Sequence, residues 1–365
     1  MGEALNFKVS QNGAYNVNTE TLQKTLLKKI NHFALDHQFD GFTKQHLFIK
    51  RVINNSWGQD IAALSNMAEA IRNLSVSGGI HLKDAQTSIN GIVDKALHPK
   101  VSPYKADITN VSTFGNFGYY LEHLNIILGC FETIGGGKYK GLNEKISKHL
   151  LELSLSNEDY HARLLPNVKM KWSADQAAII YSLYLFDKNN GTDFHSNLAR
   201  HWLKFLRDKS THNKTGLFKT EVTGTKKYSG QPRGCSHSYM TYYMAAFAPE
   251  VAQEQWALFK EHMLIEKFGV TGFREYLPEY RSKWTPDTGP IFFGIGVAAS
   301  GLALKSAATL KDHITLHRLT KVSLPLLTAM HVVSGIPIIK LLTAFGTDLL
   351  ATSILLNALS IDKSA

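Results

Sequence analysis

The sequence predicts an all-α protein in which six helical hairpins close into a ring, an (α/α)6 toroid. Short polar and aromatic segments, here called junctions, each precede an apolar run and recur every 52 to 61 residues, which is the spacing of a repeat architecture. Within each period an amphipathic segment alternates with a more apolar one. One residue from each junction marks the repeat: Asp60, Asn116, Asp175, Cys235, Asp287 and Asp348. The last unit is the most apolar, unlike the polar end cap of an open solenoid, so one ring-shaped domain over residues 1–365 is predicted.

The amphipathic member of each hairpin is expected on the outside of the ring. In these segments apolar residues recur at helical spacing, and polar residues fill the opposite face. The second segment ends at His98-Pro99, because proline cannot continue a helix. The outer helices are expected over residues 19–37, 83–97, 143–155, 194–209 and 250–264.

The apolar members are expected to line the inside of the ring, each starting directly after a junction. Residues 171–186, KWSADQAAIIYSLYLF, are the clearest example. Here Ser173 is the predicted N-cap, and Asp175 lies in the first turn, where a helix favours negative charge. The other runs are IAALSNMAEAIRNL, LEHLNIILGCFETIGG, YMTYYMAAFA, IFFGIGVAASGLALKSA and LLATSILLNAL.

Strand signals are sparse and local. TEVTGTKKYSG places β-forming residues around a glycine-containing turn, which predicts one small β-hairpin near residues 218–231.

The composition indicates an ordered globular protein, with 44% hydrophobic and only 19% charged residues. The net charge of +10 is spread along the chain without basic runs or a zinc or RNA-binding motif, so no nucleic-acid partner is expected. Cys130 and Cys235 form no disulfide or zinc pattern. The N-terminus lacks a secretory signal pattern, and a cytoplasmic location is predicted.

Membrane insertion is not expected. Pro325, Pro337, Lys340 and Asp348 interrupt the apolar C-terminal runs, whereas a transmembrane helix needs about 20 consecutive apolar residues. Buried helices are therefore favoured over peripheral membrane contact. The expected partner is a small-molecule substrate, and the sequence leaves open whether the chain forms a homo-oligomer.

In a toroid the junctions meet at one end, so their titratable side chains become candidates for catalysis. Acid and base work needs two such groups in different environments, and Asp175 and Asp287 are the best-placed pair. Glu275 is a reserve carboxylate, next to Arg274, which could keep one carboxylate ionised. Cys235 is a further candidate, because a helix start and His237 close by would lower a thiol pKa.

The other junction side chains are candidates for substrate binding. Three of the five tryptophans and several tyrosines lie in or beside junctions, and an aromatic lining with a few polar groups is typical of a small-molecule site. No histidine spacing supports a metal, so neither metal nor cofactor is predicted. The binding candidates are Trp57, Asp60, Asn116, Tyr119, His123, Trp172, Arg233, Tyr239, Arg274 and Trp284.

The junctions resemble the corresponding segments of the six-hairpin (α/α)6 superfamily, which includes glycan-active hydrolases, lyases and epimerases. Leu165-Pro166-Asn167 with Trp172-Ser173-Ala174-Asp175-Gln176, and Asp287-Thr288-Gly289-Pro290 with the glycine-rich run that follows, most resemble the linalool dehydratase/isomerase-like branch. That branch uses cysteines in its site, and none occurs between residues 164 and 176. This departure counts against the linalool reaction itself and favours a reaction in which Asp175 donates or accepts the proton. Arg233-Gly234-Cys235-Ser236 resembles an Arg-Gly segment of unsaturated glucuronyl hydrolases.

Three functions remain open from the sequence. The leading hypothesis is a cofactor-independent lyase, isomerase or cyclase that uses aspartate acid/base chemistry on a small, largely apolar substrate in a central aromatic cavity. The alternative is a glycoside hydrolase or epimerase in which the junction tryptophans are sugar platforms. The third is a binding scaffold without catalysis.

Overall fold

The computed structural model describes most of the repeat, and the junction at Asp348 lies outside the part it describes. The described residues are 19–36, 57–104, 108, 110–222, 230–283, 285, 287–321 and 349–361.

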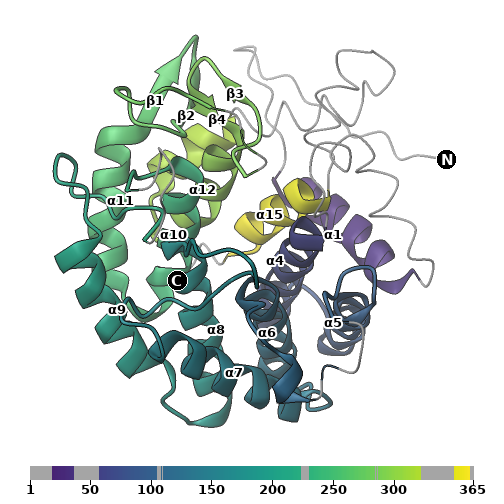
Figure 1. The fold of residues 1–365 in the computed structure, drawn as a ribbon. Coiled ribbons are helices and arrows are strands. Elements are labelled where there is room, and N and C mark those ends of the chain that lie inside the picture. The colour runs from purple at the N-terminus through teal and green to yellow at the C-terminus, as the bar shows by residue number, and fades with distance from the viewer. Residues whose placement is uncertain are drawn as a thin grey trace.

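Six helices form a closed inner ring (Figure 1). They are α4 (Trp57–Val76), α6 (Gly118–Thr133), α8 (Ser173–Asn190), α10 (Gly234–Phe247), α12 (Val297–Thr309) and α15 (Leu349–Ser360). Each helix packs against the next, and α15 packs against α4, so the last inner helix meets the first. The predicted (α/α)6 toroid is confirmed.

Amphipathic helices cover the outside of this ring. They are α1 (Thr19–Leu35), α5 (Leu82–Leu97), α7 (Lys140–Leu155), α9 (His195–Lys209) and α11 (Pro249–Met263). In α9 the buried residues are Leu198, Ala199, Trp202 and Leu206, which lie on one helical face. Helix α1 packs against both α5 and α15, so the two ends of the described chain lie side by side.

The junctions gather at one end because α4, α6, α8 and α10 are each followed by an outer helix that returns the chain to its starting end. These four inner helices therefore run in the same direction. A bond between two junctions shows this: the Tyr119 hydroxyl of α6 donates to the Gly58 carbonyl of α4 over 3.1 Å. A 3₁₀ helix, η1 (Val111–Thr113), lies in the connection that leads to α6.

A buried polar network fills the ring farther along the inner helices. The Lys305 ammonium of α12 donates to Asn66 at 2.7 Å and lies 3.4 Å from Glu69, both on α4. Asn357 of α15 donates to Glu69 at 3.0 Å, and the Tyr242 hydroxyl of α10 donates to it at 2.9 Å. The network joins four of the six inner helices and was not predicted.

Two small antiparallel hairpins interrupt the helical pattern. Strand β1 (Leu264–Lys267) pairs with β2 (Val270–Phe273), and β3 (Ile291–Phe292) pairs with β4 (Ile295–Gly296), beside α11 and α12. Each turn is a Phe-Gly pair with both residues at positive φ, the conformation of a type I′ turn. The predicted hairpin near residues 218–231 falls largely on 223–229, outside the described residues; in its flanks the Thr220 amide donates to the Gln231 carbonyl at 3.0 Å.

Two sequence predictions about inner helices are wrong in detail. The helix expected from residue 291 begins only at Val297, because β3 and β4 take up the first six residues of that apolar run. Ser173 is the first helical residue of α8 rather than its N-cap, which is Trp172. The Ser173 hydroxyl instead donates to the Lys219 carbonyl at 3.0 Å, and its amide donates to Thr220.

No helix among the described residues is both long enough and apolar enough to cross a membrane.

Gly234, at the start of α10, tests how tightly the junctions pack. A Cβ there would lie 2.0 Å from the Arg274 carbonyl oxygen and 2.7 Å from the Ala299 Cβ. We expect Gly234→Ala to lower the free energy of unfolding by about 1–3 kcal/mol, measured by urea denaturation. Gly301→Ala on α12, where a Cβ meets nothing within 4 Å, should instead raise it by about 0.5–1 kcal/mol. Equal effects of the two changes would contradict this packing.

Candidate functional site

Asp175 lies in the first turn of α8, at the end of the ring where the junctions gather. Its side chain is partly exposed. Loss of surrounding water, together with the negative charge of Asp287, raises the pKa of Asp175 to about 7. A carboxyl group with a pKa near 7 can both donate and accept protons at neutral pH.

Two tyrosines, Tyr119 and Tyr239, are affected by the charge of Asp175, and both contact His123. The Tyr119 ring meets the His123 ring edge-on, with centroids 5.0 Å apart, and the Tyr239 hydroxyl lies 3.2 Å from His123 Nε2. Burial raises the pKa of both tyrosines, and the charge of Asp175 adds to the effect in each. Burial also lowers the pKa of His123 to about 3, so this imidazole is neutral at pH 7.

Glu122 of α6 belongs to the same group, although the sequence did not single it out. Its side chain is fully buried, with Oε1 3.8 Å from His123 Nε2. Burial and the neighbouring Asp175 charge raise the pKa of Glu122 well above its usual range. Neither carboxyl oxygen has a hydrogen-bond partner among the residues that the structure describes.

A second cluster forms around Glu275, which lies shortly after β2. Its carboxylate accepts from Arg233 Nε at 3.0 Å, from the Cys235 amide at 3.0 Å and from the Cys235 thiol at 3.1 Å. Glu275 is thereby bound to the N-terminus of α10. Burial, followed by the Glu275 charge, raises the pKa of Cys235 well above its usual value, which keeps the thiol protonated and disfavours a nucleophilic role.

Asp287 connects the two clusters. It is exposed, with Oδ2 4.0 Å from a terminal nitrogen of Arg233. Arg233 itself is buried, donates to the Thr285 hydroxyl at 3.2 Å and lies over the Tyr276 ring at 5.7 Å. The Asp287 charge also acts on Asp175 and Tyr119, so both predicted aspartates belong to one electrostatic environment.

Other predicted residues lie apart from this group. His237 points toward the outer helix α11, where Nε2 lies 3.3 Å from Gln255 and the ring stacks on Phe259; burial lowers its pKa to about 4. Arg233, not Arg274, makes the ion pair with Glu275, and the Arg274 backbone bridges to Ile295 in β4.

The remaining candidates are placed by their junctions. Asp60 is buried in the first turn of α4, and Asn116 is partly exposed just before α6. Trp172, also partly exposed, is the N-cap of α8 and bridges to Glu221 through its backbone. Trp57 begins α4, but its side chain is not among those described, and Trp284 lies outside the described residues.

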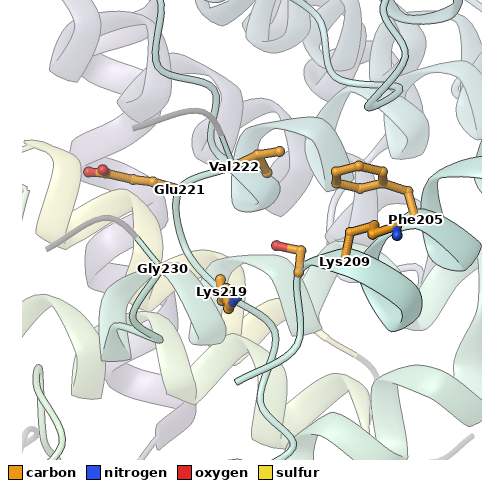
Figure 2. A pocket seen from close by; sticks show the side chains of 7 residues that line it. Phe205, Lys209, Lys219, Glu221, Val222 and Gly230 are labelled. Atoms are coloured by element: carbon orange, nitrogen blue, oxygen red, sulfur yellow. The ribbon is translucent and has the colours of Figure 1, made fainter. Parts of the chain in front are cut away.

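A shallow surface depression of about 250 Å³ lies close to the start of α8 (Figure 2). It is open and lies between the C-terminal part of α9 and the chain that follows it. In that chain the Val222 amide donates to the Lys171 carbonyl at 3.1 Å. The lining residues are Phe205, Lys209, Ser210, Lys219, Glu221, Val222 and Gly230.

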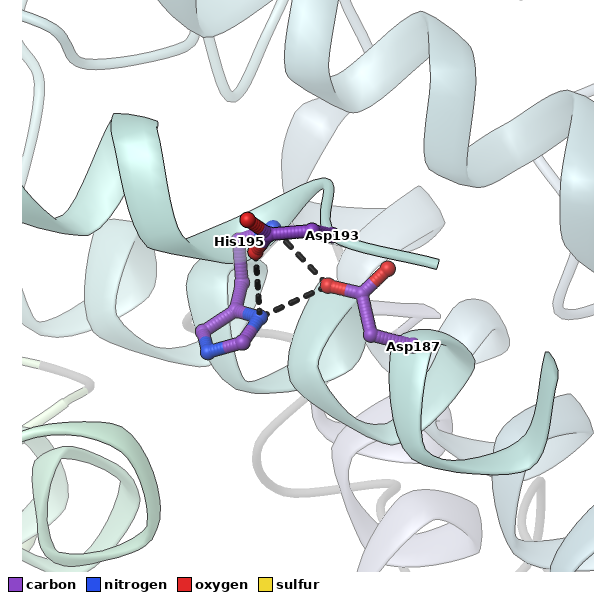
Figure 3. Close-up of side chains that lie close together, drawn as sticks. All are labelled: Asp187, Asp193 and His195. Atoms are coloured by element: carbon purple, nitrogen blue, oxygen red, sulfur yellow. Dashed lines mark hydrogen bonds and ion pairs between the residues drawn. The ribbon is translucent and has the colours of Figure 1, made fainter. Parts of the chain in front are cut away.

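Asp187, Asp193 and His195 form a further acidic cluster (Figure 3). His195 Nδ1 lies 2.7 Å from Asp187 Oδ2, and the Asp187 carboxylate accepts from the Phe194 and His195 amides at 2.9 Å each. These bonds satisfy two of the free amides at the start of α9. We therefore assign the cluster a structural role.

Glu122 was missed because it lies within the apolar run LEHLNIILGCF. That position is itself the signal that sequence reasoning could have used: an acidic residue inside a buried helix is rare unless it is paired or functional. The Lys305–Glu69 pair carries the same signal, with a lysine inside the apolar run of α12 and a glutamate inside that of α4.

The raised pKa of Asp175 predicts a pH-dependent effect of Asp175→Asn on stability. With a folded-state pKa of about 7 against an ordinary 3.8, the folded protein holds this proton more tightly than the unfolded chain does. Ionisation therefore costs stability increasingly as pH rises from about 4 to about 7, with no further change above. The melting temperature of Asp175→Asn minus that of the wild type should increase over this range and then level off. A pH-independent difference would contradict the assigned environment.

Comparison with solved structures shows the same fold in proteins of very different sequence. The Lin0763 protein from Listeria innocua matches with a TM-score of 0.56 and 10% identity, over 94% of this chain and 97% of its own. The GH76A α-1,6-mannanase from Salegentibacter sp. HEL1_6 matches with a TM-score of 0.55 and 11% identity, over 95% and 99%. No protein-family model and no curated protein matches the sequence. The chain thus shares its (α/α)6 toroid fold with these two proteins.

Proposed function

We propose that this protein is a glycoside hydrolase whose active site lies where the inner-helix junctions meet, with Asp175 as a catalytic carboxylate. The observation that carries the proposal is the position of Asp175, at the N-terminus of an inner helix, partly exposed, with a pKa raised to about 7. The shared fold of a named α-1,6-mannanase supports a carbohydrate substrate over an apolar one.

The surroundings of Asp175 suit glycosidic bond cleavage. Glycosidases use two carboxyl groups, one protonated and one ionised, and both Asp287 and Glu122 lie in the electrostatic environment of Asp175. The partly exposed rings of Tyr119, Trp172 and Tyr239 offer flat apolar faces for the CH groups of a sugar, and their polar edges offer hydrogen bonds. The effect of the Asp287 charge on the pKa of Asp175 also favours an enzyme over a binding scaffold.

A lyase, isomerase or cyclase acting on a small apolar substrate is the second candidate. The observation that favours it is the number of tyrosines beside the acid, because aromatic faces stabilise cationic character. It requires the same acid/base role for Asp175 and differs in both the substrate and the reaction.

The proposal is tested by hydrolysis of α-1,6-mannan and a panel of other polysaccharides, followed as release of reducing ends. We expect the wild type to cleave at least one of them, and Asp175→Asn to lower the rate by about 10²–10⁴-fold with unchanged helical circular dichroism. Asp193→Asn, at an exposed aspartate of the α9 cluster, is the matched control and should leave the rate unchanged. A fully active Asp175→Asn enzyme would refute the role of Asp175. Conversion of terpenoid alcohols without any glycan cleavage would favour the second candidate.

A further inference from the structure

Among the described residues of the inner helices, two glutamates are fully buried, and their surroundings are opposite in character. Glu69 of α4 takes hydrogen bonds from Tyr242 and Asn357 and lies 3.4 Å from the Lys305 ammonium. Glu122 of α6 has no hydrogen-bond partner on either oxygen within the described residues. Leaving a buried polar group without a partner costs about 1–3 kcal/mol, so Glu122 is not explained by a contribution to stability.

The position of Glu122 places it beneath the candidate site. Glu122 is one turn along α6 from Tyr119, and residues three apart share a helical face. His123 Nε2 lies between the Glu122 carboxyl, at 3.8 Å, and the Tyr239 hydroxyl, at 3.2 Å. His123 Nδ1 is a further buried atom without a hydrogen-bond partner in the described part of the chain.

The charges that act on Glu122 come from one neighbour. The negative charge of Asp175 on α8 raises the pKa of Glu122, whereas the charges of both acids raise the pKa of Tyr119 and of Tyr239. No lysine or arginine within the described residues lies within 4.0 Å of the Glu122 carboxylate oxygens. Burial and the Asp175 charge both favour the neutral acid, so Glu122 holds its proton when Asp175 has lost its own.

We propose that Glu122 is the general acid of this site and Asp175 its basic partner. Glu122 is a buried carboxyl in the surroundings of Asp175, and its oxygens form no hydrogen bond with any described residue. This inference rests on the proposed glycoside hydrolase function. It makes Glu122, rather than Asp287, the catalytic partner of Asp175 and leaves Asp287 as a charge that raises the pKa of Asp175.

The reaction balances with water as the second reactant. The Glu122 proton passes to the glycosidic oxygen as the bond from that oxygen to the anomeric carbon breaks. The oxygen of a water molecule forms the new bond to that carbon, and one water proton passes to Asp175. Glu122 is then ionised and Asp175 neutral, and proton exchange with solvent restores both. Division of labour between two carboxyl groups of different pKa is the general logic of such sites.

Access to Glu122 requires a side chain to move. Glu122 and His123 are fully buried, whereas Tyr119 and Tyr239 beside them are partly exposed. In this proposal, rotation of one of these tyrosine side chains opens the carboxyl to a bound sugar. A substrate hydroxyl could then supply the hydrogen bonds that Glu122 lacks.

The test compares Glu122→Gln on two substrates that differ in their need for a proton. Cleavage of α-1,6-mannan needs an acid for its sugar leaving group, whereas 2,4-dinitrophenyl α-mannoside releases a stable phenolate without one. We expect a loss of about 10²-fold or more on mannan and a much smaller loss on the aryl mannoside. Glu132→Gln, at the other end of α6, is the matched control and should leave both rates unchanged.

Two further readouts separate catalysis from folding. Because Gln removes a carboxyl whose proton must be held at neutral pH, Glu122→Gln should keep or raise the melting temperature at pH 7. Glu69→Gln, which disrupts a satisfied network, should lower it. The infrared band of a protonated carboxyl at pH 7 should be weaker in Glu122→Gln than in the wild type.

The outcomes are distinguishable. Equal losses on both substrates, an unchanged rate on mannan, or an infrared band as strong as that of the wild type would overturn the role of Glu122 while leaving the hydrolase proposal in place through Asp175→Asn. A wild-type protein that cleaves neither these mannosides nor any polysaccharide in the panel would overturn the proposed function itself.

Discussion

The ion pair between Lys305 and Glu69 is the contact on which the closed ring most depends. It joins α12 to α4 across 236 residues of sequence, and Asn357 of α15 and Tyr242 of α10 complete the hydrogen bonds of the glutamate. The Lys305 ammonium also lies 3.7 Å from the centre of the Tyr242 ring. Burial lowers the pKa of Lys305 to about 8, against the opposing charge of Glu69. A buried charge is tolerated only with such partners, and removing one of them typically costs about 3–5 kcal/mol.

This network gives the two ends of the inner ring different characters. Farther along the inner helices the polar groups around Glu69 are hydrogen-bonded and hold α4, α10, α12 and α15 together. Near the junctions, Glu122 and the Nδ1 atom of His123 lack partners among the described residues, and the pKa values of Glu122 and Asp175 are raised. The Glu69 network therefore stabilises one part of the ring interior. In the other part the unpartnered Glu122 lowers stability, which a functional role would explain.

The sequence predicts the ring because its signals are periodic. Asp60, Asn116, Asp175 and Cys235 mark the starts of successive apolar helices, and the structure brings those starts together. The two hairpins escaped prediction because their turns, Phe268-Gly269 and Phe293-Gly294, lack the usual Asn-Gly or Asp-Gly signature.

The site was only partly predictable, because side-chain partners are set by tertiary contacts. Asp175 is evident from its place at the start of an apolar helix, but nothing local shows that Glu275 is bound to Arg233 and Cys235, 42 and 40 residues away. Glu122 was missed because its apolar neighbours predict an ordinary core helix. Its significance follows only from the absence of a partner in the described ring and from the approach of Asp175 on a different hairpin.

In the proposed function a carbohydrate binds and reacts where the junctions meet. The most direct measurement is a crystal structure of the Asp175→Asn protein soaked with an oligosaccharide that the wild type cleaves. We expect a sugar ring against Tyr119 and Tyr239, with its glycosidic oxygen within hydrogen-bond distance of Glu122. A sugar bound instead in the depression lined by Phe205 and Lys219, or elsewhere on the outer helices, would contradict it.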